Sequence, residues 1–92
     1  MDHIFDTGTN SSVTVGATST LVVDKRSERR YCLLVNDSDE VIYLALGADA
    51  VMNKGIPIWP TGYIELDGTM PFKGLIRAIC ASGGKNLTIF DA

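Results

Sequence analysis

Short segments in which hydrophobic and polar residues alternate follow one another along most of the chain. Val13 and Val15 alternate with polar residues, and the same period of two returns in residues 63–67 and 86–91. Residues 18–24 are rich in the β-branched side chains that favour strands. A period of two sends successive side chains to opposite faces of a strand. We therefore predict a strand in each of these segments.

Two further segments are apolar on both faces. Residues 31–35 and 75–81 read this way, which predicts central strands covered on both sides. Residues 36–40 are a strong turn signal of Asn, Asp, Ser and Glu, and residues 41–46 return as a strand, so a hairpin is expected. Pro57 and Pro60 confine the next apolar stretch to a sheet edge or an extended crossing.

These segments amount to seven or eight short strands, with turn signals at roughly the 8–12-residue spacing typical of all-β folds. We predict an all-β fold with one domain, an antiparallel β-sandwich or flattened barrel of the jelly-roll kind. Residues 48–53 have the only helical leaning, at most one short helical turn. Residues 1–11 are predicted to be a flexible N-terminal arm, and residues 12–92 the β-sandwich domain.

The length of the chain limits the folds, and therefore the functions, that are possible. A chain of 92 residues with 46% hydrophobic residues makes one compact domain and leaves no room for a second. It is too short for a pair of Rossmann units or a TIM barrel. A domain of this size has a thin stability margin, and assembly is a common way to widen it. We therefore expect a small binding or structural module that forms a homo-oligomer.

Charge disfavours nucleic acid as a partner. Eight basic against 11 acidic residues give a net charge of −3, whereas duplex binding needs a basic face. The exception is residues 25–30, with four cations and one acid. This segment is interpreted either as an anion contact or as a solvated turn whose charges protect a sheet edge.

The sequence also indicates the cellular location of the protein. The N-terminus lacks the basic and apolar regions of a secretory signal, so synthesis in a cytoplasm is expected. No apolar run approaches the roughly 18–20 residues of a membrane helix, so no membrane partner is expected.

Residues that could carry chemistry are few. His3 is the only histidine and falls in the predicted arm, which disfavours His-based catalysis and a multi-histidine metal site. No phosphate-binding loop is present. Asp37, Asp39 and Glu40 form either a plain hairpin turn or a weak cation site. We expect no enzyme activity, no catalytic residue, no metal and no cofactor.

Cys32 and Cys80 are the two cysteines, and each lies inside an apolar run. Free cysteines behave as small hydrophobic residues and are often buried, which is the expectation here. A disulfide would require the two strands to be neighbours that face the same way, and the sequence leaves this open.

Five residues are candidates for an interface. Trp59, Tyr63 and Phe72 lie in the segment 55–74, which is rich in Pro and Gly. They could close the core, anchor a contact between subunits or offer a shallow site for sugars. Ile4 and Phe5 are apolar residues in the polar arm and could dock on a neighbouring subunit.

The order of several sequence pieces resembles a family of small virion structural proteins of tailed bacteriophages. The pieces are Val13-Thr14-Val15-Gly16, Thr18-Ser19-Thr20, Arg29 or Arg30 before Leu33-Leu34-Val35-Asn36-Asp37-Ser38, Ile42-Tyr43-Leu44-Ala45-Leu46-Gly47, Gly55-Ile56-Pro57-Ile58 with Pro60 and Gly62, Gly74-Leu75-Ile76-Arg77-Ala78-Ile79, and Leu87-Thr88-Ile89.

The resemblance covers most of the chain after Ser12. It implies a head-decoration, head-fibre or tail-accessory module in the virion. Such a module acts by self-assembly and by docking on other virion proteins, and the family pattern supplies no catalytic residue. The alternative reading is a carbohydrate-binding module that uses Trp59 and Tyr63 as a stacking platform.

Overall fold

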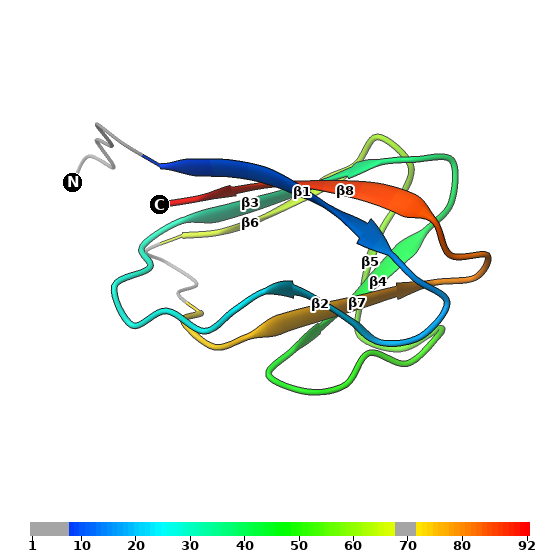
Figure 1. Cartoon of the computed structure of the whole chain (residues 1–92), viewed down its shortest axis with the longest axis horizontal. Helices are drawn as coiled ribbons and strands as arrows, with labels where there is room; N and C mark the ends of the chain where they lie inside the picture. The colour runs from blue at the N-terminus through cyan, green and yellow to red at the C-terminus, as the bar shows by residue number, and fades with distance from the viewer. Residues whose placement is uncertain (1–7, 68–71) are drawn as a thin grey trace.

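The computed structural model describes residues 8–67 and 72–92 of the chain, and these residues form eight strands and no helix (Figure 1). The all-β prediction is confirmed. The strands are β1 (Thr9–Val15), β2 (Thr20–Val23), β3 (Cys32–Asp37), β4 (Ile42–Leu46), β5 (Ile56–Ile58), β6 (Tyr63–Leu66), β7 (Ile76–Cys80) and β8 (Lys85–Asp91).

The strands form two four-stranded sheets that pack face to face (Figure 1). One sheet has the order β1-β8-β3-β6 and the other has the order β2-β7-β4-β5. Every pair of neighbouring strands is antiparallel. Both sheets are open, so the molecule is a sandwich and not a closed barrel.

The connectivity is that of a jelly roll. Strand β1 pairs with β8, β2 with β7, β3 with β6 and β4 with β5, so the first half of the chain pairs with the second half in reverse order. This long double-stranded ribbon is wrapped into two sheets by the additional pairs β3·β8 and β4·β7. Eight strands in two sheets with this wrapping define the jelly-roll class, which confirms the predicted architecture.

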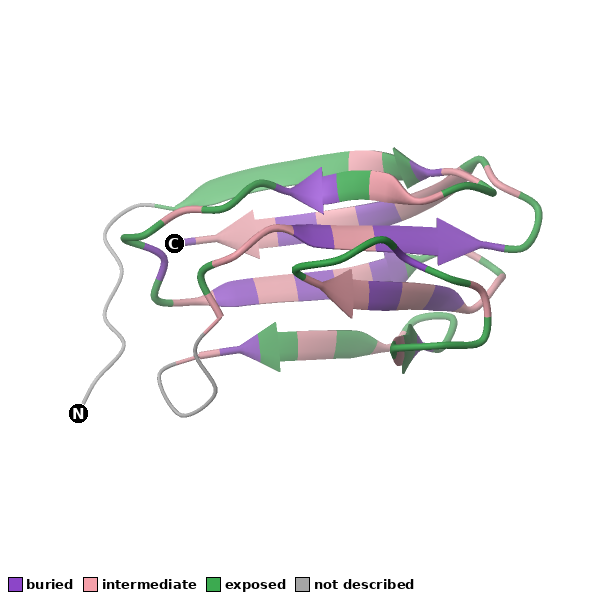
Figure 2. Cartoon of the chain, turned by 90° about the horizontal axis from the view of Figure 1, so that it is seen from below, coloured by how far each residue is buried: buried purple, intermediate pink, exposed green. Residues whose placement is uncertain are grey.

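The core lies between the two sheets. Alternate residues of the central strands point inward and are fully buried, among them Leu34 of β3, Leu44 of β4, Ile76 of β7 and Leu87 of β8. Figure 2 shows these buried positions recurring along the strands, whereas the connecting loops are mostly partly exposed or exposed. The period of two in the sequence therefore marks which side chains fill the sandwich.

Two sequence-based boundaries differ from the structure. Strand β1 begins at Thr9, three residues before the predicted start at Ser12, so residues 9–11 of the predicted arm belong to a sheet. These residues are polar and exposed, and only their pairing with β8 makes them a strand. Residues 1–7 lie outside the described residues. Residues 48–53 form no helix: this loop ends in a turn in which Asn53 has a φ of 65°.

The prediction that β3 is covered on both faces was wrong. β3 is central, between β8 and β6, and its inward residues are buried. Its outward residues Leu33 and Val35 remain partly exposed. The apolar pattern is therefore real, but within the described part of the chain no third layer covers this face (Figure 1).

Candidate functional site

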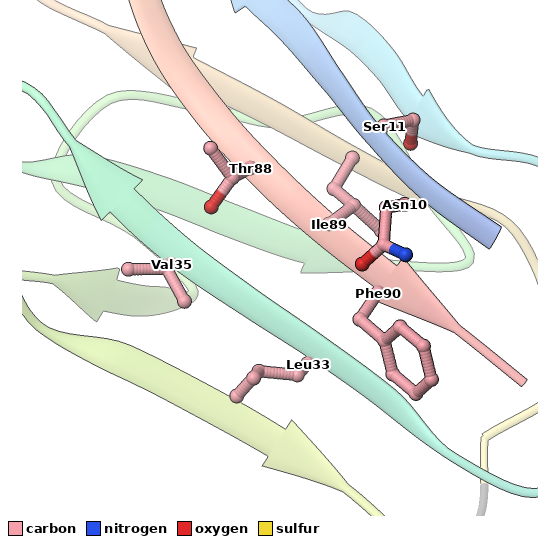
Figure 3. Close-up of a pocket in the computed structure, with 7 residues that line it drawn as sticks. All are labelled: Asn10, Ser11, Leu33, Val35, Thr88, Ile89 and Phe90. Atoms are coloured by element: carbon pink, nitrogen blue, oxygen red, sulfur yellow. The ribbon is translucent and has the colours of Figure 1, made fainter. Parts of the chain in front are cut away.

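The outward side of the sheet β1-β8-β3-β6 carries a shallow apolar depression. It has a volume of about 320 Å³ (Figure 3). Leu33 and Val35 come from β3, and Thr88 and Phe90 from β8. Asn10 and Ser11 of β1 and Ile89 of β8 complete the lining. A sheet face that keeps Leu, Val and Phe partly exposed is the feature expected of a contact surface.

The strand register arranges this surface in two rows that cross all four strands. In one row Leu33 lies between Glu65 on β6 and Phe90 on β8, and Phe90 faces Asn10 on β1. In the other row the residues in order are Tyr63, Val35, Thr88 and Ser12. We call these eight residues the outer face. Its centre is apolar, and polar residues of β1 and β6 border it.

A hydrogen bond fixes one end of the outer face. The Tyr31 hydroxyl donates to Glu65 Oε2 over 2.6 Å, and the Tyr31 ring lies 5.9 Å from the Phe90 ring at an angle of 60°. The hydrogen bond to Glu65, followed by burial, raises the pKa of Tyr31 to about 12. The phenol therefore stays protonated at neutral pH and holds the Glu65 side chain beside the aromatic pair.

Two of the five predicted interface residues stand exposed at either end of one turn. Trp59 and Tyr63 each have 62% of their surface exposed. Between them Thr61 takes a φ of 64°, and the Gly62 N–H donates to the Trp59 carbonyl over 2.8 Å. Tyr63 also belongs to the outer face, so the turn carries an exposed tryptophan next to that surface.

The other three candidates fall elsewhere. Phe72 is partly buried and packs against the core, where it closes the sandwich near Gly47 and Gly74. Ile4 and Phe5 lie outside the described residues. The structure thus divides the predicted aromatics into one that supports the core and two that face solvent.

Asn36, which the sequence placed at the start of a turn, is fully buried and anchors the exposed turn. Its Nδ2 donates to the carbonyls of Glu40 at 2.7 Å and Ile58 at 2.8 Å. Its main chain accepts from Thr61 N–H at 3.0 Å and donates to the Gly62 carbonyl at 2.9 Å. The side chain and main chain of this one residue therefore tie β3 to its own turn, to the end of β5 and to the β5–β6 connection. The signal in the sequence was an Asn directly after an apolar strand.

The basic segment 25–30 contains a buried arginine that the sequence analysis missed. Arg29 is 2% exposed, and its Nε lies 3.0 Å from Asp91 Oδ1. Its two other nitrogens donate to the carbonyls of Phe72, Gly74 and Asp24. The interpretation as a solvated turn was wrong for this residue, because its guanidinium binds strand and loop atoms. Nothing in a run of four cations shows which one turns inward.

Both cysteines are buried, as expected, and they are free thiols. Cys32 lies on β3 and Cys80 on β7, in different sheets, so they are not neighbours within one sheet. Burial raises the pKa of the Cys32 thiol to about 11. The Cys80 Sγ donates to the Val15 carbonyl over 3.4 Å.

The acidic residues of the 36–40 turn connect it to the β7–β8 turn. Glu40 accepts from the N–H and the hydroxyl of Ser82, and Asp39 lies 2.7 Å from Lys85 Nζ. These bonds hold the pKa of both carboxyls below the usual range. Within the described residues no group of three or more His, Cys, Asp or Glu side chains is arranged to hold a metal ion.

Comparison of this chain with known proteins found no match. No protein-family model matches the chain, and no curated protein or solved structure shows significant similarity to it. The described residues also contain no helix long and apolar enough to cross a membrane.

Proposed function

We propose that the protein is a non-enzymatic virion structural protein of a tailed bacteriophage, a decoration, fibre or tail-accessory module. It acts by self-assembly and by docking on other virion proteins. The observation that carries the proposal is the outer face, a partly exposed apolar surface, together with the nearby hydrogen-bonded turn that bears Trp59. Together with the sequence resemblance stated above, this favours a role in contacts between proteins.

The energetics of this surface favour burial by a partner. Apolar area contributes about 25 cal/mol per Å² when it is removed from water. Large rigid aromatics such as Trp59 and Tyr63 often dominate the binding energy of an interface. Both stand on a turn held by the buried Asn36, so little conformational freedom would be lost on binding.

The fold is compatible with the proposed function. Jelly rolls occur in viral capsid domains, and they occur in lectins and other proteins as well. Because one fold hosts many functions, the proposed role rests on the outer face. Two charged residues of the candidate segments are engaged in the fold: Arg29 binds Asp91, and Glu40 binds Ser82.

Two measurements test the proposal. Size-exclusion chromatography with light scattering, over a micromolar concentration series, reports self-association. Co-sedimentation with purified tailed-phage virions that lack the protein reports docking. We expect the double variant Trp59→Ala/Tyr63→Ala to weaken docking at least tenfold. The control is Val51→Ala, which truncates another exposed apolar residue, 51% exposed, in the β4–β5 loop. A strict monomer that also fails to bind virions would overturn the proposal.

A carbohydrate-binding module is the second candidate, favoured by the same exposed pair at either end of one turn. Sugars stack on exposed aromatic rings, and lectins share the jelly-roll class. A glycan array separates the two functions. Glycan binding that disappears in Trp59→Ala, with the fold intact, would support the lectin function over the virion function.

A further inference from the structure

The two sheets end in four edge strands, and three of them carry a feature that blocks further pairing. β5 has three residues, and the central one is Pro57, which has no N–H to donate. β2 has four residues and an irregular register between Leu21 and Val23. β6 has four residues, and Glu65 stands among them. Short length, proline, bulges and charge are the known ways of protecting a sheet edge.

The fourth edge, β1, has none of these features. Its seven residues, Thr9–Val15, include no charged residue and no proline. All seven pair with β8 in an unbroken register, from Thr9 opposite Asp91 to Val15 opposite Lys85. From Thr9 to Thr14, one side of the strand is therefore a regular row of backbone N–H and C=O groups directed away from the sheet. Val15 is fully buried and its carbonyl accepts from Cys80 Sγ, so it lies outside this row.

We propose that a second copy of this chain pairs antiparallel along β1, which joins the two β1-β8-β3-β6 sheets into one of eight strands. A symmetric pair of this kind needs a self-complementary edge, and an antiparallel strand meets its own copy in that way. The protein has a net charge of −3, and two copies would repel each other at a charged edge. β1, β2 and β5 contain no charged residue, so this repulsion disfavours only β6. The proline of β5 and the irregular register of β2 then leave β1 as the edge that can pair.

The pairing would also enlarge the proposed contact surface. Asn10 and Ser12 of β1 end the two rows of the outer face. An antiparallel partner strand would continue these rows into the outer face of the second copy. This inference rests on the self-assembly in the proposed function and names the interface that performs it.

The test uses lysines that protect the edge without entering the core. Ser12 and Thr14 are both exposed, so Ser12→Lys/Thr14→Lys adds two charges there. In an antiparallel pair these lysines face those of the second copy, and like charges opposite each other destabilise a sheet. Ala48→Lys/Ala81→Lys adds the same charge at two exposed loop positions and serves as the control. Urea unfolding checks that all variants fold.

We expect the edge variant to raise the dissociation constant of the dimer at least tenfold, and the loop variant to leave it within a factor of two. A second measurement is independent of charge. Single substitutions Asn10→Cys, Ser12→Cys and Thr14→Cys are oxidised, and the residue on the symmetry axis should form a dimer through a disulfide. The native thiols are buried and should stay reduced.

The outcomes separate this inference from the proposed function. Equal self-association of both lysine variants, with no cross-linked dimer in the cysteine series, would overturn pairing along β1 and leave assembly through another surface. A monomer that still binds virions would also overturn the inference, while the docking function stands. A monomer that binds no virion would overturn both.

Discussion

Arg29 Nε donates to Asp91 Oδ1 over 3.0 Å, an ion pair that joins the loop before β3 to the last residue of β8. The Arg29 side chain is 1% exposed and that of Asp91 is 18% exposed. The same guanidinium donates to the carbonyls of Phe72 and Gly74 in the connection between β6 and β7. One buried cation therefore closes the end of the sandwich.

Replacing Arg29 should destabilise the fold strongly. Arg29→Met leaves the carbonyls of Asp24, Phe72 and Gly74 without this donor, whereas Asp91 keeps Arg26 as a partner at 3.1 Å. The loss of these charge-assisted hydrogen bonds should cost about 3 kcal/mol. Arg29→Lys should recover only part of the loss, because an ammonium lacks the planar fork of donors. Urea unfolding measures both. Lys25→Met, at an exposed position in the same segment, is the control and should change stability by no more than about 0.5 kcal/mol.

Asn36 should tolerate substitution poorly. Asn36→Ala removes the two hydrogen bonds from Nδ2 to the Glu40 and Ile58 carbonyls, of which the bond to Ile58 is buried, at a cost of about 2 kcal/mol. Thermal and urea unfolding report the loss. Asn86 makes a single exposed side-chain bond to Asp37, so Asn86→Ala is the matched control. Equal effects of the two variants would contradict the anchoring role of Asn36.

Two glycines with positive φ should differ sharply. Gly84 has a φ of 67° and open space around an added Cβ, so Gly84→Ala should cost only about 1–2 kcal/mol for the left-handed backbone. Gly55 has a φ of 91°, and its Cβ would lie 2.2 Å from the Leu44 carbonyl oxygen. Gly55→Ala must therefore displace β5 from β4 and should cost clearly more. Similar unfolding midpoints for the two variants would show that this close approach is relaxed in solution.

The Tyr31–Glu65 hydrogen bond should be visible as a pH effect. Because the folded state raises the pKa of Tyr31 to about 12, the bond stabilises the protein fully below pH 10. That stabilisation is lost as the pH rises from 10 to 12. Absorbance titration of the phenols should show one late transition, and Glu65→Gln should move it toward 10. A late transition that persists in Glu65→Gln would assign the shift to burial instead.

The buried thiols should be chemically silent in the native protein. Cys32 is fully buried and its pKa is raised to about 11, so almost no thiolate exists at pH 8. Cys80 is fully buried as well. Reaction with a thiol reagent should be slow in the native state and complete in urea, with two cysteines modified per chain. Fast native labelling would show that the sandwich opens locally.

Local pattern was a good guide to the strands and a poor guide to buried polar residues. Alternation along β8 and the apolar run of β3 marked their strands, because side chains that fill a core must recur every second residue. The all-β class and the sandwich or flattened barrel followed from the number of strands and the spacing of turns. The pairing of β1 with β8 is a relation between the two ends of the chain, and a single sequence holds no local signal for it.

The site was predicted in part for the same reason. Trp59 and Tyr63 stood out as aromatics beside Pro and Gly, and they are exposed. Phe72 stood out equally and packs on the core. Phe72 differs from Trp59 and Tyr63 because its loop packs against the core, and no local pattern in the sequence shows which loop does so. Arg29 was hidden among charged neighbours, since its burial depends on Asp91, 62 residues away.

The pairing of the first strand with the last also governs when the protein folds. During synthesis β1 leaves the ribosome well before its partner β8, so the sheet that contains both is completed only after β8 has been made. Strand pairs so distant in sequence form slowly, because loop closure precedes any gain from contacts. β1 stays unpaired during this interval. Because few of its residues are apolar, the unpaired strand has a low tendency to start aggregation.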